Sequence, residues 1–311
     1  MKNMINKTHI EGVLYEHDLQ LRTTGEKSKN PGTEFIMGTI SIATNNDMTN
    51  IVPVHFTYVT ATTAKGNANS TFTILKKIIN GDLATMMDKG VEAAAKLRID
   101  SAIGLNEFYS DRSGKEELVS AKRNEGGFIH KASVVTDDED LRNTFEVDML
   151  ITNVREIEAD PEKDLPAKGI VKGAIFDFRK SLLPVEFSVT NPNAISYFVG
   201  LGASAKEPVF TRVKGAQISE TIVRKVVEES AFGAPSVREV PSSRKDWVIT
   251  WAQTEPYAWD EEGSITAAEL TEAMANREVY LAGVKQRQDE YNATKSQTTP
   301  SSAPSKASFN F

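Results

Sequence analysis

The chain has 311 residues, of which 40% are hydrophobic and 25% are charged, and its formal net charge is −7. This balance is typical of a globular protein, and the length is sufficient for two domains. The absence of cysteine excludes disulfides, thiolate zinc sites and cysteine nucleophiles. We expect no signal peptide and no membrane span, and therefore a cytoplasmic location, because no apolar run is long enough.

The first half of the chain predicts β-strands. Residues 10–23 are expected to form one long strand, and a turn-rich loop follows at 25–32. Residues 34–59 predict two strands joined by a polar turn, because apolar side chains alternate on both sides of it. Gly38 lies in the middle of the first of these strands and predicts a bend or bulge. This stretch is therefore expected to be a curved antiparallel hairpin.

A helix and two more strands are predicted after a polar loop at 60–70. The helix is expected to begin at Ser70 or Thr71 and to end at Gly81, and the strands cover 96–109 and 117–122. The predicted order is one strand, a hairpin, a helix and a pair of strands. A five-stranded Greek-key barrel of the oligonucleotide-binding (OB) type has this order. We therefore predict a mainly β fold with an OB-like barrel domain at 1–135.

The second half repeats this order more loosely. Strands are predicted at 145–157, 170–178, 183–189, 209–213 and 246–253, with a short helix at 191–201. A second β-rich domain at 136–262 follows, and whether it is also OB-like stays open. Thr266 and Glu269 form a capping box at the start of an amphipathic helix assigned to 263–291. Residues 292–311 are expected to be a disordered tail.

The patterns expected of enzymes are weak. His9, His17, His55 and His130 show no metal-ligand spacing, and the acidic run at 137–140 is typical of a solvated loop. We therefore expect no catalytic residue, no metal and no cofactor.

Binding of single-stranded nucleic acid has better support. It requires basic side chains along a groove and aromatic faces on which bases stack. Aromatic residues on strands also form cores, so each has a structural alternative. The acidic excess lies mainly after residue 131, which leaves the first half more basic. The candidate DNA-binding residues are Lys27, Lys29, Phe56, Tyr58, Lys65, Phe108, Tyr109, Lys122, Arg123, Arg179, Lys180, Arg244, Lys245 and Trp247.

Several segments resemble a group of OB-fold single-stranded-DNA-binding proteins encoded by bacteriophages and prophages of Gram-positive bacteria. They are GTEFIMGTISIAT, NIVPVHFTYV, NSTFTILKKIINGD and SAKRNEGGFIH, and the similarity extends to ITAAELTEAMANREVYLA. The resemblance implies non-enzymatic binding of single-stranded DNA in phage replication or recombination, in the cytoplasm of the host cell.

The end of the chain is a candidate partner site. Phe309 and Phe311 form an aromatic tip like that of bacterial single-strand binders, on a tail without the acidic residues of those proteins. Replication or recombination proteins are the expected partners of the tip, and homo-oligomers are a further possibility. The alternatives are a virion structural β-barrel protein of the tail or capsid, then a β-rich DNA mimic that inhibits a host factor, and last an enzyme.

Overall fold

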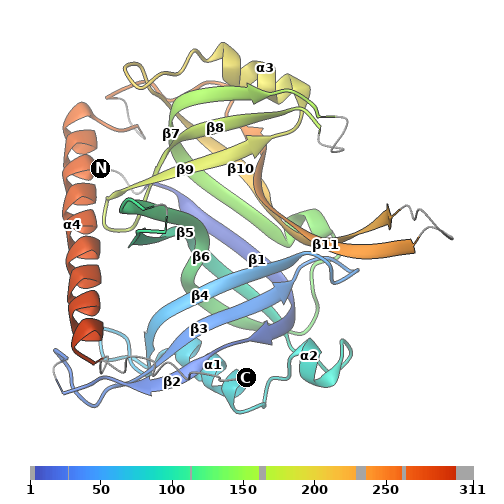
Figure 1. The fold of residues 1–311 in the computed structure, drawn as a ribbon, viewed down its shortest axis with the longest axis vertical. Coiled ribbons are helices and arrows are strands. Elements are labelled where there is room, and N and C mark those ends of the chain that lie inside the picture. The colour runs from blue at the N-terminus through green and yellow to red at the C-terminus, as the bar shows by residue number, and fades with distance from the viewer. Residues whose placement is uncertain are drawn as a thin grey trace, which may run out of the picture.

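The computed structural model describes residues 4–26, 28–112, 114–160, 166–228, 236–260 and 264–298. Side chains are described throughout these ranges except at 221–243 and 294–298. The fold is mostly β, with one large sheet and a long C-terminal helix along one side (Figure 1).

The first five long strands close into a ring. They are β1 (Asn6–His17), β3 (Glu34–Ala43), β4 (Ile51–Thr60), β5 (Lys96–Ser110) and β6 (Glu117–Ala132). The antiparallel pairs β1–β3, β3–β4, β5–β6 and β1–β5, with the parallel pair β4–β6, complete the circuit. Helix α1 (Ser70–Ile79) and the short α2 (Met86–Lys89) lie between β4 and β5 in the chain. This is the strand order of an OB barrel, so the predicted fold class is confirmed.

The hairpin of β3 and β4 forms as its alternation predicts. Ile36, Ile40 and Ile42 have no exposed surface, and the register of the two strands shifts between Ile36 and Gly38. Gly38 has a φ of 130°, and a Cβ atom there would lie 2.8 Å from the Cα of Leu19. The bulge therefore depends on glycine at this position.

Several element limits differ from the sequence prediction. Residues 10–23 contain parts of two strands, β1 and β2 (Gln20–Thr23), because the chain turns back to extend the edge of β3. Strand β6 continues through 123–127, where Gly126 and Gly127 have positive φ and accommodate a register shift. The side chain of Asn69, rather than Ser70 or Thr71, caps α1 by accepting from the Thr71 amide at 3.1 Å.

The second half forms another ring with the same order. Its strands are β7 (Asn143–Ile157), β8 (Lys168–Phe176), β9 (Leu182–Val189), β10 (Val209–Glu228) and β11 (Ser236–Ala252), with α3 (Pro192–Gly200) after β9. The pairs β7–β8, β8–β9, β10–β11 and β7–β10 are antiparallel, and β9–β11 is parallel. The chain therefore contains two OB-like barrels. A 3-10 helix, η1 (Glu139–Leu141), lies in the acidic run between them.

Buried polar contacts join the barrels. Strand β1 pairs with β7, and the side-chain amides of Asn124 and Gln217 exchange two hydrogen bonds of 2.9 and 2.8 Å. The Asn143 side chain donates to the Gln217 carbonyl oxygen at 2.5 Å. Because buried amides are costly to leave unpaired, this junction favours one relative placement of the barrels. The expected domain boundary at 135/136 stays a prediction.

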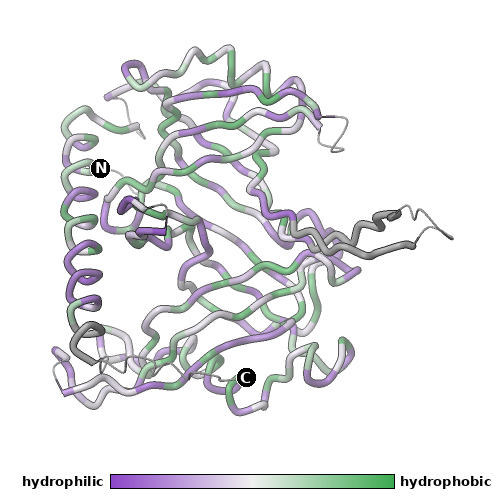
Figure 2. Tube along the Cα trace, in the orientation of Figure 1, coloured by the Kyte–Doolittle hydropathy of each residue, from purple (hydrophilic) through white to green (hydrophobic). Residues whose placement is uncertain are grey.

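Helix α4 (Ala267–Thr298) lies along both barrels (Figure 1). Its predicted capping box is confirmed, since the Glu269 amide donates to Thr266 Oγ at 3.2 Å and the Thr266 amide to Glu269 Oε2 at 3.1 Å. The predicted amphipathic pattern holds only in part: Val284 is buried as expected, but the apolar side chain of Met274 is 54% exposed. Figure 2 shows a mainly hydrophilic helix, which agrees with docking through a narrow face.

Candidate nucleic-acid interface

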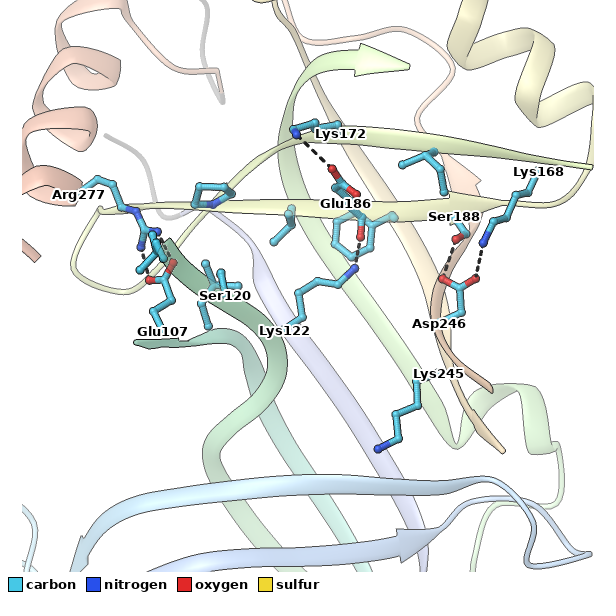
Figure 3. Close-up of a pocket in the computed structure, with 16 residues that line it drawn as sticks. Glu107, Ser120, Lys122, Lys168, Lys172, Glu186, Ser188, Lys245, Asp246 and Arg277 are labelled. Atoms are coloured by element: carbon cyan, nitrogen blue, oxygen red, sulfur yellow. Dashed lines mark hydrogen bonds and ion pairs between the residues drawn. The ribbon is translucent and has the colours of Figure 1, made fainter. Parts of the chain in front are cut away.

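A cleft of about 510 Å³ lies between the two barrels, and we call it the first cleft (Figure 3). Strands β5 and β6 of the first barrel form one wall, and β8, β9 and β11 of the second form the other. Helix α4 contributes Arg277. The cleft is lined by cationic, anionic and apolar side chains, and its two walls come from segments far apart in the sequence.

Cations outnumber anions in the first cleft. Five basic side chains (Lys122, Lys168, Lys172, Lys245 and Arg277) lie with three carboxylates (Glu107, Glu186 and Asp246). Lys172 Nζ is 3.2 Å from Glu186 Oε1, and Lys168 Nζ is 3.8 Å from Asp246 Oδ2. Such partly exposed pairs are weak, so a phosphate can compete for these lysines. Among the described residues, Lys122 and Lys245 have no carboxylate within ion-pair distance.

Lys122 is the most constrained cation of the cleft. Its Nζ donates to the carbonyl oxygen of Glu186 and lies 4.7 Å from the ring centroid of Phe187 and 5.7 Å from that of Trp247. Burial lowers the pKa of Lys122 to about 8, against the attraction of Asp246 and Glu186. The charge of this ammonium group therefore depends on its surroundings near neutral pH.

Arg277 anchors α4 to the wall of the cleft. Its guanidinium binds the Glu107 carboxylate in a bidentate pair, with 2.6 Å between Nη1 and Oε2. The Glu107 side chain has no exposed surface and that of Arg277 is 10% exposed. The pair is therefore a fixed structural contact, and Figure 3 shows it at the end of the cleft nearest the helix.

A second cleft of about 450 Å³ adjoins the first, and we call it the second cleft. It also lies between the barrels and contains Arg123 of β6, Phe178 and Arg179 of the β8–β9 turn, and Tyr280 of α4. Lys122 and Arg123 are neighbours on a strand, so their side chains point to opposite sides and into different clefts. Leu105 lines both clefts.

The structure brings some of the predicted residues together. Lys122 and Lys245 meet in the first cleft, and Arg123 and Arg179 meet in the second. Trp247 packs against the rings of Phe145 and Phe187 behind Lys122. The other described candidates lie outside both clefts, and most of them are exposed: Lys29, Tyr58, Lys65, Phe108, Tyr109, Lys180 and Arg244.

Three of the aromatic candidates differ in their surroundings. Phe56 has no exposed surface and belongs to the core of the first barrel, so its expected role in base stacking is wrong for this conformation. Tyr58 is 50% exposed and its ring lies 4.7 Å from that of Phe35. Tyr109 is partly covered by α4, with Lys285 Nζ 5.4 Å from its ring centroid. Lys27, Phe309 and Phe311 lie outside the described residues.

Sequence reasoning missed other residues of the clefts. Lys168, Ile170 and Lys172 are every second residue of β8, so their side chains share the face toward the first cleft. That spacing was visible, but a lysine on a strand usually indicates only a solvated face. Arg277, Phe178 and Tyr280 could be assigned only after the helix and the turn had been placed against the first barrel.

Neither a metal centre nor a helical membrane segment is found in the described part of the chain. Within those ranges, no group of three histidine or acidic side chains could hold a metal ion. None of the described helices is long and apolar enough to cross a membrane.

Comparison with known proteins assigns a family. The family model described as YorF matches residues 5–287, which is most of the chain. No curated protein matches. Among solved structures, a crystal structure of a deletion mutant of the single-stranded DNA binding protein from Thermus aquaticus is similar with a TM-score of 0.45 and 9% identity. The match covers 84% of this chain and 100% of that one.

Proposed function

The chain belongs to the YorF family, and from its clefts we propose that it binds single-stranded DNA and is not an enzyme. The support for this proposal comes from the site itself. The observation that carries it is the gathering of four lysines in a cleft between two OB-like barrels. OB-like barrels are a common scaffold for oligonucleotides, and a basic groove is what a phosphate backbone requires.

The exposed aromatic ring beside the clefts favours a single strand over a duplex. Each cleft has walls from both barrels, and the aromatic side chain of Phe178 is 89% exposed beside the second. An unpaired strand can place phosphates on the cations and turn bases onto exposed rings, whereas a duplex keeps its bases stacked. Binding without strong sequence preference follows, because backbone contacts and stacking carry little sequence information.

The proposal is tested by fluorescence anisotropy with labelled oligo(dT) and with a duplex of the same length at low salt. We expect tighter binding of oligo(dT). Lys245→Glu should weaken this binding, whereas Lys131→Glu, an exposed lysine of β6 outside both clefts, should change it less. Equal affinity for both nucleic acids, or no binding of either, would contradict the proposal.

The biological setting proposed here rests on the sequence resemblance to phage proteins. It is the coating of single-stranded DNA during phage replication or recombination, in the cytoplasm of a host cell. Recruitment of a replication or recombination protein through Phe309 and Phe311 belongs to the same proposal, and both residues lie outside the described part of the chain. Pull-down from host extract with and without residues 308–311 tests this recruitment.

A further inference from the structure

The second cleft combines an exposed aromatic ring with two arginines and two unpartnered buried donors, which is more than the general proposal uses. We propose that it holds one unpaired nucleotide, with the base stacked on Phe178 and the phosphate near Arg123 and Arg179. This inference rests on the proposed function, because a bound single strand would supply the nucleotide. A free nucleotide has the same chemistry, and the test below separates the two sources.

The ring of Phe178 is exposed on the surface, where a base can stack on it. Phe178 lies in the turn between β8 and β9 and is 89% exposed, although phenylalanine is usually buried. Its described ring contact is the Arg179 guanidinium, whose central carbon lies 5.0 Å from the ring centroid. Stacked aromatic and guanidinium groups together form the kind of surface on which a base stacks.

The turn that carries Phe178 is held in place by its own hydrogen bonds. The Asp177 carboxylate accepts from the backbone amides of Arg179 and Ser181, at 2.8 and 2.7 Å. Asp177 is therefore engaged in the turn, and within the described residues no carboxylate pairs with Arg179. The positive charge of Arg179 remains available for a phosphate.

Two buried polar atoms at this cleft lack partners. Arg123 Nε and Ser181 Oγ are inaccessible to solvent, and neither makes a hydrogen bond within the described residues. Both residues line the second cleft, and Ser181 is only 5% exposed. Buried donors normally have a partner, and two without one at the same cleft mark a place where ligand binding can add hydrogen bonds. Both atoms are covered here, so a phosphate oxygen reaches them only when the neighbouring side chains move on binding.

Glu125 and Tyr280 also line the second cleft, beside Arg123 and Phe178. Glu125 accepts from Arg123 Nη2 at 2.8 Å and fixes one edge of the guanidinium. Burial raises the pKa of Tyr280, so its hydroxyl stays protonated at neutral pH and can donate a hydrogen bond. Arg277 lies 5.6 Å from the Tyr280 ring and also lines the first cleft. The two clefts therefore lie side by side, with Arg277 lining the first and Tyr280 lining the second.

The test uses oligo(dT) carrying one 2-aminopurine, whose fluorescence falls when the base stacks. With the wild-type protein at saturation, we expect strong quenching when the probe occupies one register of the strand. Phe178→Ala should abolish that quenching and weaken binding about ten-fold, which corresponds to the loss of one stacked base. Phe178→Trp should retain both. Phe128→Ala is the matched control, because Phe128 is 69% exposed but lines neither cleft.

Ser181→Ala gives an independent readout. Removing an unpaired buried hydroxyl should leave the thermal midpoint unchanged or raise it, while the affinity for oligo(dT) falls several-fold because a phosphate contact is lost. A merely structural serine would not show this opposite behaviour. Unchanged affinity in both Ser181→Ala and Phe178→Ala would overturn the inference.

A free-nucleotide titration distinguishes the two sources. If 2-aminopurine deoxyribonucleoside monophosphate is quenched at the same concentration as the oligonucleotide and requires Phe178, the ligand is a free nucleotide. If quenching needs far higher concentrations, the ligand is part of a strand. Absence of any oligonucleotide binding by the wild-type protein would instead refute the proposed function.

Discussion

Lys122 should make the affinity of the first cleft for single-stranded DNA depend on pH. Its pKa of about 8 reflects burial, and the groups facing it are Glu186, Asp246, the Phe187 ring and the Trp247 ring. A bound phosphate would favour the charged form and raise this pKa, so binding would take up a proton. The affinity for single-stranded DNA should therefore fall as the pH rises above 8, by at most about one log unit per pH unit.

The measurement is a pH series of oligo(dT) affinity from 7 to 9.5 at constant ionic strength. Lys122→Arg is the control, because arginine stays charged throughout this range and should remove the pH dependence. The free energy of unfolding should instead rise with pH, whereas the affinity falls. The folded pKa lies below the ordinary value of 10.5, so the unfolded chain binds more protons between these values and stability rises with pH. An affinity that stays constant across the series in the wild type would contradict the role of Lys122.

Gly38 shows a backbone requirement at the same scale. Its φ of 130° disfavours any side chain, and a Cβ atom would lie 2.8 Å from Leu19 Cα and 2.9 Å from the Asp18 carbonyl oxygen. We expect Gly38→Ala to lower the free energy of unfolding by about 2 kcal/mol or more, measured by chemical denaturation. Gly25→Ala is the control, since no atom lies within 4 Å of its added Cβ. Equal stability of the two variants would show that the bulge tolerates a side chain.

At the scale of elements, the buried pair of Arg277 and Glu107 fixes α4 to β5. Arg277→Met would leave a buried carboxylate without a partner, and we expect a loss of about 3–5 kcal/mol in stability. The double variant with Glu107→Leu should lose clearly less, because it removes both charges. Denaturation of both single variants and the double variant measures this coupling.

Lys285, also on α4, provides a control for the Arg277 variant. Lys285 pairs with Glu116 and Asp289 at the exposed part of α4, where solvent weakens such contacts. Lys285→Met should therefore leave stability unchanged within error. If Arg277→Met behaved like Lys285→Met, the helix would be held by its apolar contacts alone.

At the scale of the whole molecule, a chain of charge −7 must bind a polyanion through a local patch. Each phosphate neutralised on a single strand contributes about −0.7 to the slope of log affinity against log salt concentration. Removing one such contact with Lys245→Gln should reduce the slope by about that amount. Lys131→Gln lies outside the clefts and should leave the slope unchanged. A salt-independent affinity in the wild-type protein would exclude backbone contacts as the main interaction.

Local patterns in the sequence were sufficient to predict much of the fold. The alternation in β3 and β4, the glycine at the bulge and the capping box of α4 depend on neighbours in the chain, so they can be recognised there. The order of strands and helix gave the barrel class for the first half and left it open for the second. The limits of β6 and β10 were missed, because alternation there is interrupted by glycines and by charged residues.

Tertiary structure alone decided which candidates meet. Phe56 and Tyr58 share a face by simple alternation, yet β4 carries one extra residue between Phe56 and Val59, which turns Val59 toward the core and leaves Tyr58 exposed. Neighbouring Lys122 and Arg123 are directed into separate clefts, where each meets side chains of the second barrel and of α4. The physical reason is that sequence periodicity fixes the face of a strand, whereas a cleft requires the registers, bulges and docking contacts that place one barrel against the other.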